Sequence, residues 1–279
     1  MSKWSAYWRR YSKNTPAVIG LIIVIFFSLV AILAPWILPY DPLQIGAGDP
    51  LQPPSIEHIM GTDDLGRDIF SGVLYGARVS LFVGFVAAAI STGIGILIGV
   101  NAGYYGGKID NALMRITEIF LTIPGLLLLL VLVAIFGQKI WYIVVVIGIT
   151  IWPSTARLVR AEFLTLRERG FVEAAKALGA RDFYIIFSEI LPNALPSIIV
   201  NASLQVANAI MMEAGASFLG LSDPTLISWG RMISNAQLFI RHAWWMAFFP
   251  GLSICLLVLA FNLVGEGLNI ALSPRLTEK

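Results

Sequence analysis

The stretch Glu173-Ala174-Ala175-Lys176-Ala177-Leu178-Gly179 lies within Glu162–Pro192, the least hydrophobic long interior segment of the chain. Gly179 separates two apolar stripes with helical i, i+3, i+4, i+7 spacing. The stripes are Phe171, Ala174, Ala175, Leu178 and Phe183, Ile186, Phe187, Ile190. Glycine suits the left-handed residue that ends a helix, and Asp182 is placed to cap the next one. The segment therefore predicts a helix, a turn and a second helix.

The surrounding sequence is that of a membrane protein. Of its 279 residues, 57% are hydrophobic and only 13% are charged, and the mean hydropathy is +0.80. Soluble proteins have about a quarter charged residues. Six windows lack charged residues and are long enough to cross a hydrocarbon core of about 30 Å. The windows are Ala17–Leu38, Val79–Val100, Ile119–Gln138, Ile140–Ala156, Ile190–Met212 and Ala243–Gly265. They predict an all-α integral membrane protein with six transmembrane helices, the third and fourth forming a tight hairpin.

The distribution of basic residues predicts the orientation of these helices. If the N-terminus is cytoplasmic, fourteen of the nineteen Lys and Arg residues are cytoplasmic as well, as the positive-inside rule requires. Residues 39–78 then form a turn-rich extracytoplasmic loop, and residues 157–189, which contain the opening stretch, form a cytoplasmic loop. Residues 17–272 form a single membrane domain, and residues 273–279 a cytoplasmic tail.

Residues 1–16 precede the first span, which we expect to be retained rather than cleaved as a signal peptide. Their aromatic residues share one helical face, opposite several basic residues, as in a helix that lies among lipid headgroups. The aromatic residues are Trp4, Tyr7, Trp8 and Tyr11. An interfacial helix is favoured over an unstructured basic tail.

Chemistry carried by the chain itself is poorly supported. The nearest match to a phosphate-binding loop, Ala102–Ile109, lacks both the first glycine and the final Ser or Thr, so its glycines indicate a helix end and turn. His58 and His242 lack metal-ligand spacing and are expected to be solvated or interfacial. Cys255 is the only cysteine and is expected to be buried in the last span. We expect no bound metal, cofactor or nucleic acid.

Polar side chains within spans are a better functional lead, because they are costly there. Asn201, Gln205 and Asn208 form one stripe on the fifth span, and Glu213 lies on a different face near the outer helix end. The stripe has two open interpretations, a translocation path or hydrogen bonding between helices. A further polar set, at Asp110, Arg115 and Glu118, is expected to be a solvated helix end.

One repeated spacing predicts close packing. Gly95, Gly99 and Gly103 recur every four residues, which allows another helix to approach the second span closely.

The opening stretch also resembles a known motif. Glu173-Ala174-Ala175, Gly179 and Leu191-Pro192 match in type and spacing the cytoplasmic EAA loop of permease subunits in ABC-type importers. Glu189 departs from that pattern, in which an isoleucine is usual, although Ile190-Leu191-Pro192-Asn193 is similar to the dipeptide and oligopeptide branch. The resemblance implies that an ATPase docks on this loop. The residues carrying this coupling role are Glu173, Ala174, Ala175, Lys176, Leu178 and Gly179.

Two other segments resemble the C-type subunit of dipeptide, oligopeptide and nickel importers. One is Gly61-Thr62-Asp63-Asp64-Leu65-Gly66-Arg67-Asp68, and the other is the chain end from Gly265 to Leu276, in which Glu266 and Ser273 replace the usual aspartates. The signature residues of the first segment are Gly61, Thr62, Asp63, Gly66, Arg67 and Asp68.

The family resemblance implies a type I ABC importer permease (MetI-like) fold in a prokaryotic inner or plasma membrane, with both termini cytoplasmic. Its implied partners are a homologous B-type permease, two ATPase subunits that bind ATP and magnesium, and an extracytoplasmic solute-binding protein. The expected cargo is a short peptide, with nickel and oligosaccharides as alternatives. A membrane enzyme using Glu213 or Glu266, and a channel or carrier without an ATPase, are less favoured.

Overall fold

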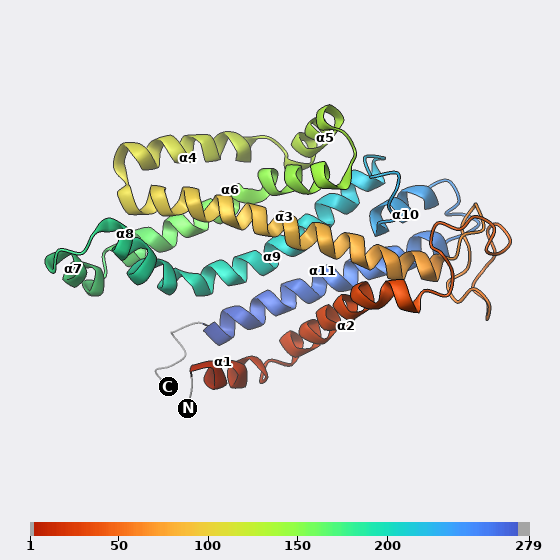
Figure 1. Cartoon of the computed structure of the whole chain (residues 1–279), viewed down its shortest axis with the longest axis horizontal. Coiled ribbons are helices and arrows are strands. Elements are labelled where there is room, and N and C mark those ends of the chain that lie inside the picture. Colours follow the sequence, from red (N-terminus) through yellow and green to blue (C-terminus); the bar gives the residue numbers. More distant parts are fainter. Residues whose placement is uncertain (1–2, 273–279) are drawn as a thin grey trace.

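The computed structural model describes residues 3–272, and its regular elements in that range are all helices (Figure 1). The predicted tail, residues 273–279, and the end of the C-terminal motif lie outside the described residues. Five helices are long and apolar enough to cross a membrane, and a bent pair makes a sixth. The five are α2 (Thr15–Ile37), α3 (Ile69–Tyr105), α6 (Ile140–Arg167), the continuous helix Asp182–Phe218, and α11 (Trp245–Leu272).

The continuous helix has three parts. It begins as α8 (Asp182–Tyr184), passes through the π-helical turn η1 (Ile185–Ile190), and continues as α9 (Leu191–Phe218). The second helix of the predicted helix-turn-helix is therefore the start of the fifth span and not a separate element. Short helices complete the fold, namely α1 (Lys3–Tyr11), α7 (Gly170–Ala177) and α10 (Trp229–Ala236).

The third span differs from the prediction of one straight helix over Ile119–Gln138. The structure divides this region into α4 (Gly107–Thr122) and α5 (Gly125–Phe136), which meet at 87°. Proline disfavours helical backbone at the residue before it, and Ile123 is accordingly extended, with ψ of 126°, ahead of Pro124. The predicted short turn after this span is confirmed, because α6 begins at Ile140 after only three residues.

The second and fourth spans pack closely through small residues. A Cβ atom added to Gly99 would lie 2.6 Å from the carbonyl oxygen of Ala156, and Gly95 and Gly103 face α6 equally closely. This α3–α6 seam, defined by the three glycines, confirms the predicted close approach (Figure 1). At the end of α3, Gly106 and Gly107 have φ of 66° and 56° and turn the chain into α4, as expected for a helix end.

Two helices extend from the charge-free windows into segments that were expected to be loops. Residues 69–78, expected in the outer loop, form the start of α3, and residues 157–167, expected in the cytoplasmic loop, form the end of α6. A hydropathy window stops at the first charge, whereas a helix continues wherever its backbone bonds and packing allow. Cys255 also differs from expectation, because it is exposed on α11 and not buried.

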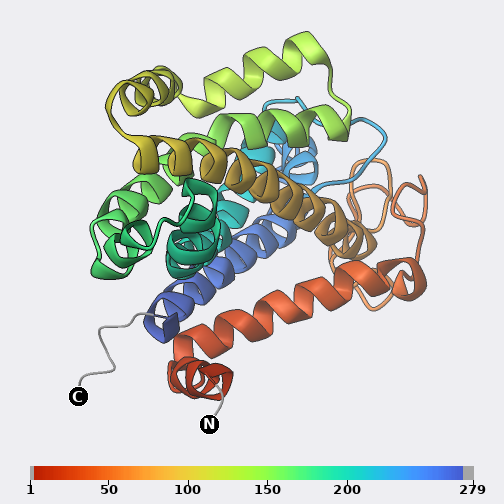
Figure 2. The ribbon, with the colours of Figure 1, turned by 60° about the vertical axis from the view of Figure 1, so that its left-hand side comes forward.

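The N-terminal segment is helical, as predicted. Figures 1 and 2 show α1 lying beside the start of α2 and the end of α11. Tyr11 is buried there, and its hydroxyl donates a hydrogen bond to the carbonyl oxygen of Ala17 at 3.0 Å. The next helix is capped by Asn14, whose side chain accepts from the Ala17 amide at 3.2 Å. The side chain of Trp4 lies outside the described part of the chain.

Candidate functional site

The turn between α7 and α8 has the geometry predicted from the position of Gly179. This residue has φ of 81°, in the left-handed region that side chains disfavour. Its amide donates to the Lys176 carbonyl at 2.9 Å, and the Ala180 amide donates to the Ala175 carbonyl at 3.0 Å. This pair of bonds is a Schellman cap, which satisfies the last carbonyls of α7. The predicted helix, turn and helix are confirmed.

Asp182 does not act as the predicted cap. Arg181 occupies the N-cap position, and no side chain caps α8. The Asp182 carboxylate accepts instead from the Tyr104 hydroxyl at 2.7 Å, and Arg167 donates to the Tyr104 carbonyl oxygen at 2.9 Å. Asp182 therefore attaches the start of α8 to the end of α3, and Arg167 attaches the end of α6 to the same tyrosine.

The apolar residues of this segment divide into a buried and an exposed set. The buried residues, which pack against the ends of α3 and α6, are Val172, Ile185, Ile186 and Ile190. Leu178 is 89% exposed and Phe183 is 73% exposed, and the rings of Phe183 and Phe187 lie 4.5 Å apart. We call the exposed set the coupling patch; its members are Phe171, Leu178, Phe183, Tyr184 and Phe187.

The EAA residues lie beside this patch. Glu173, Ala174 and Lys176 are exposed, whereas Ala175 is partly buried against the neighbouring spans. The two predicted apolar stripes are therefore each split, since part of each stripe secures the segment and part faces outward. An exposed apolar surface of this kind, rimmed by charges, is characteristic of a protein interaction site.

The polar stripe on α9 forms hydrogen bonds to α6. The Gln205 side chain is 1% exposed, and its amide nitrogen donates to the Ser154 hydroxyl at 2.7 Å and to the Ile151 carbonyl at 3.1 Å. Asn201 accepts from the Thr155 hydroxyl at 2.8 Å. These bonds hold α6 and α9 together in an apolar environment, where alternative partners are scarce.

Asn208 extends this network to an open surface. Its amide donates to the Gln205 side-chain oxygen at 2.9 Å, and the residue itself is exposed. It lines a groove of about 340 Å³ between α4, α6 and α9, together with Thr150, Ser154 and Gln205. The stripe therefore both forms hydrogen bonds between α6 and α9 and contributes polar side chains to the lining of this groove.

Glu213 does not join this stripe. It is 2% exposed near the C-terminal end of α9 and accepts from the Ser217 hydroxyl at 2.7 Å. Its other carboxyl oxygen has no hydrogen-bond partner among the described residues. It lines a separate small cavity near Asp223 and Ser228.

Asp223 lies in the short loop that follows α9. Hydrogen bonds from Thr225 and Ile140 and the charge of Arg231 outweigh the effect of partial burial and lower the pKa of Asp223.

The segment from Gly61 to Asp68 anchors the start of α3. Asp68 caps the helix, accepting from the Ser71 amide and hydroxyl, both at 2.7 Å. Its other oxygen lies 2.9 Å from Nδ1 of His58. His58 is 2% exposed, so the expectation that it is solvated was wrong, whereas His242 is exposed. The Thr62 carbonyl accepts from the Trp245 indole at 3.1 Å, which ties this segment to α11.

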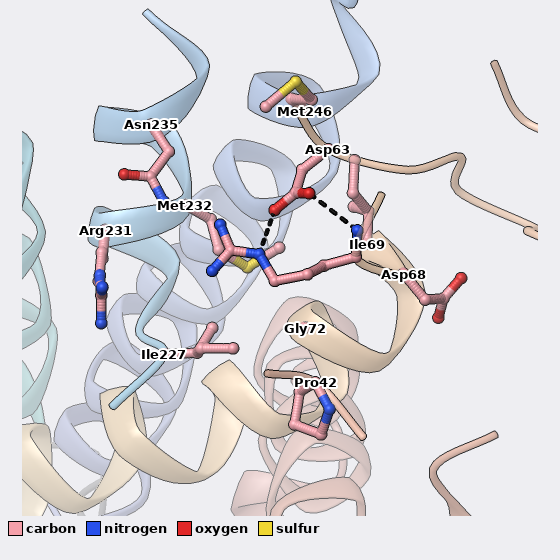
Figure 3. A pocket seen from close by; sticks show the side chains of 11 residues that line it. Pro42, Asp63, Asp68, Ile69, Gly72, Ile227, Arg231, Met232, Asn235 and Met246 are labelled. Atoms are coloured by element: carbon pink, nitrogen blue, oxygen red, sulfur yellow. Dashed lines mark hydrogen bonds and ion pairs between the residues drawn. The ribbon is translucent and has the colours of Figure 1, made fainter. Parts of the chain in front are cut away.

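A small pocket lies between this segment, α10 and the start of α11 (Figure 3). Arg67 donates to Asp63 at 2.6 Å on one side. On the other, Arg231 donates to the carbonyl oxygens of Pro224 and Leu226 at 2.6 and 2.8 Å. Burial and the nearby Arg67 charge lower the pKa of Arg231. These bonds order the loops on either side of the pocket.

Comparison with known families identifies the architecture. The family model described as the binding-protein-dependent transport system inner membrane component matches residues 95–278, which contain the coupling patch and the polar stripe. The chain belongs to this family. A second model, the N-terminal transmembrane domain of oligopeptide transport permease C, matches residues 2–54 of this permease.

Individual relatives cover almost the whole permease. It is 43% identical to the dipeptide transport system permease protein DppC of Alkalihalophilus pseudofirmus, across 99% of this chain and 91% of that protein. It is 39% identical to the oligopeptide transport system permease protein OppC of Bacillus subtilis, with the same coverage. An inward-facing structure of the MetNI methionine ABC transporter is 22% identical and has a TM-score of 0.61, covering 74% of this chain and 98% of that one. The fold is that of the MetI-like ABC importer permeases.

Several contacts of this permease were not foreseen from its sequence. Asp110, expected to be solvated, is buried and binds Arg160 through two hydrogen bonds of 2.5 and 2.6 Å. Arg115 and Glu118 form an exposed pair, as expected. Tyr104 and Arg167 secure the helix-turn-helix but belong to no motif. For Asp110 and Arg160, the only signal in the sequence was their opposite charge. Because the two residues are fifty positions apart, no regular spacing indicates that they pair.

Proposed function

We propose that this permease is one of two permease subunits in an ATP-driven importer of short peptides, and that its coupling patch is the docking surface for an ATPase. The observation that carries the proposal is the exposure of Leu178 and Phe183 on an ordered helix-turn-helix outside the apolar windows. An exposed apolar helix face is a ready partner for a groove on another protein. Charged Glu173 and Lys176 would meet polar groups at the rim of that groove.

The attachment of the patch to the spans suggests how docking becomes movement. The helix that starts at Asp182 continues without interruption to Phe218 and carries the polar stripe. Hydrogen bonds through Tyr104 connect its start to α3 and α6. Closure of two ATPases on ATP and magnesium would therefore move α9 as a rigid body. ATP would drive the cycle only if its binding favours one conformation of the complex over the other.

The groove beside Asn208 is the candidate for half of the translocation path. Its lining includes the polar side chains of Thr150, Ser154, Gln205 and Asn208. A homologous permease of the B type would supply the second half. An extracytoplasmic solute-binding protein would deliver cargo to the side bearing the loop of residues 39–68. This arrangement places both termini and the coupling patch in the cytoplasm of a prokaryotic cell, in agreement with the count of basic residues.

Short peptides are the proposed cargo because the relatives named above are dipeptide and oligopeptide transport permeases. Nickel and oligosaccharides are less favoured. Uptake by the reconstituted complex with its own binding protein tests this choice. Labelled di- and tripeptides should be taken up, and unlabelled peptides should compete, whereas nickel ions and oligosaccharides should not. Competition by nickel or an oligosaccharide alone would overturn the peptide assignment.

The docking role is tested by placing a charge in the coupling patch. Leu178→Asp should weaken ATPase binding by at least about tenfold, since buried apolar anchors carry most of an interface's energy. Leu238→Asp is a matched control, because Leu238 is equally exposed, at 87%, beyond α10. Both variants should retain the wild-type melting temperature. ATPase co-purification and peptide-stimulated hydrolysis that are unchanged in Leu178→Asp would contradict the docking role.

The path assignment is tested separately at Asn208. Asn208→Leu should change the KM for peptide uptake while leaving ATPase binding intact, because the residue lies far along α9 from the patch. Met211→Leu, one turn away in the same groove, changes the shape of the wall without removing a polar group. Identical uptake kinetics in the two variants would favour a purely structural role for the stripe.

A further inference from the structure

An apolar groove lies where the two ends of the described chain meet. It has a volume of about 390 Å³, within the range of about 300–1,000 Å³ typical of ligand sites. Three aromatic residues of α1 form one wall, and α2 and α11 form the other. The lining residues are Tyr7, Trp8, Tyr11, Leu21, Val264, Leu268, Ala271 and Leu272. Figures 1 and 2 show α1 lying against these helix ends in both views.

The groove adjoins a surface suited to lipid. Helix α2, which supplies Leu21, exposes a continuous series of large apolar side chains along its length. They include Ile19, Ile22, Ile25, Phe26 and Leu29, each about half exposed or more. A helix that is apolar around its circumference is stable in the hydrocarbon core of a bilayer. A chain of lipid that enters the groove would thus remain continuous with the surrounding bilayer.

Basic side chains stand at the same end of the molecule. Arg9 and Arg10 occupy the last turn of α1, and Lys13 follows before α2 begins. None of the three has a carboxylate within 4 Å among the residues that the structure describes. Basic residues beside a membrane surface attract anionic lipid headgroups. The apolar groove and the basic helix end together match the two parts of one amphiphile.

We propose that the groove binds an acyl chain of an anionic phospholipid, whose phosphate lies at the basic end of α1 formed by Arg9, Arg10 and Lys13. This site is independent of the proposed cargo and of ATPase docking. A bound lipid would cover the aromatic face of α1 and hold the first and last spans together. The acyl chain would contribute through van der Waals packing against the groove wall, because it leaves an environment that is already apolar.

Native mass spectrometry of the purified complex tests the site with dioleoyl phosphatidylglycerol and dioleoyl phosphatidylcholine as probes. The wild-type complex should retain one phosphatidylglycerol at least about tenfold more tightly than phosphatidylcholine. Val264→Trp, which fills the groove, should abolish this tight binding. Leu259→Trp is the matched control, because Leu259 is exposed elsewhere on α11 and does not line the groove. Equal phosphatidylglycerol binding by the two variants would overturn the groove site.

A second variant separates the headgroup from the acyl chain. Replacing Arg9, Arg10 and Lys13 with Gln should remove the preference for phosphatidylglycerol, while Arg115→Gln, which alters an exposed pair elsewhere, should preserve it. An unchanged preference in the triple variant would refute the basic end as the phosphate site. The chain's own residues 273–279 are the competing occupant, because they follow Leu272 in the groove wall. Tighter phosphatidylglycerol binding after their removal would show that this segment fills the groove.

Discussion

Glycines shape both the α3–α6 seam and the α7–α8 turn, but for different physical reasons. In the seam, the backbone of α6 leaves no space for a side chain on Gly99. At Gly179, no other atom lies within 4 Å of an added Cβ, and only the positive φ requires glycine. The seam joins two spans into a fixed scaffold, whereas the turn presents the coupling patch outward. Steric crowding therefore marks the part of this permease that should stay rigid, and backbone conformation marks the part that carries the exposed apolar residues.

The substitution with the largest expected effect places a bulky residue in the seam. Gly99→Leu should destabilise the permease by about 3 kcal/mol or more, because overpacking against backbone atoms cannot be relieved by side-chain movement. Gly93→Leu on the same helix is the control, since an added Cβ there meets nothing within 4 Å. Thermal unfolding in detergent should show a large loss for the first variant only. Similar melting temperatures for both would mean that α3 and α6 can separate without loss of stability.

The second test removes the ion pair that links α4 to α6 in this scaffold. Asp110→Asn should cost about 1–3 kcal/mol, because it leaves the Arg160 guanidinium without its charged partner in a partly buried site. Glu118→Gln breaks an exposed pair of the same chemistry and should cost less than about 1 kcal/mol. Denaturation of the two purified variants under identical conditions compares these losses. Equal losses would show that the burial of Asp110 has no energetic consequence.

The third test addresses the turn. Gly179→Val should introduce about 1–2 kcal/mol of local strain, because β-branched residues disfavour left-handed backbone. We expect a modest fall in melting temperature but a clear loss of peptide-stimulated ATPase activity in the reconstituted complex. Gly170→Val is the control in the same loop, at a position without positive φ and with open space around it. If peptide-stimulated ATP hydrolysis is unchanged in Gly179→Val, the conformation of this turn is not required for coupling.

The smallest expected effect concerns pH and the loop after α9. Because the pKa of Asp223 is lower in the folded protein, its ionised form contributes stability at neutral pH. That contribution is present above the unfolded pKa of about 3.9 and is lost as pH falls through the lower folded pKa. Asp223→Asn should cost less than about 1 kcal/mol at pH 7 and flatten the acid limb of the stability curve. An unchanged acid limb would contradict this assignment.

The sequence predicted those features that depend on near neighbours along the chain. The seam glycines and the Gly179 turn follow from spacing within one or two helical turns, and five of the six apolar windows correspond to continuous spans. The break at Pro124 was also locally encoded, but a count of apolar residues does not register it. By contrast, the burial of His58 depends on Asp68 being folded back onto it by the loop, and no sequence period signals that contact.

The same limit applies to the candidate sites. The pattern located the coupling segment, but which of its apolar residues are exposed is decided by packing against α3 and α6. Val172 is buried and Leu178 is exposed because only one of them faces these spans. Likewise, the polar stripe was visible as a helical face. Its partners Ser154 and Thr155 lie some fifty residues away in the sequence, and only the packing of α9 on α6 identifies them.

The π-helical turn η1 determines how α9 is rotated about its own axis. Such a turn accommodates an additional residue within an otherwise α-helical run. Each α-helical residue rotates the chain by about 100° about the helix axis. The additional residue therefore sets the direction in which all later side chains of the helix point. Deleting one residue between Ile185 and Ile190 would turn Gln205 away from Ser154, even though every residue of the stripe would still be present. The direction in which the stripe faces is therefore determined at the N-terminal end of the helix, next to the coupling patch.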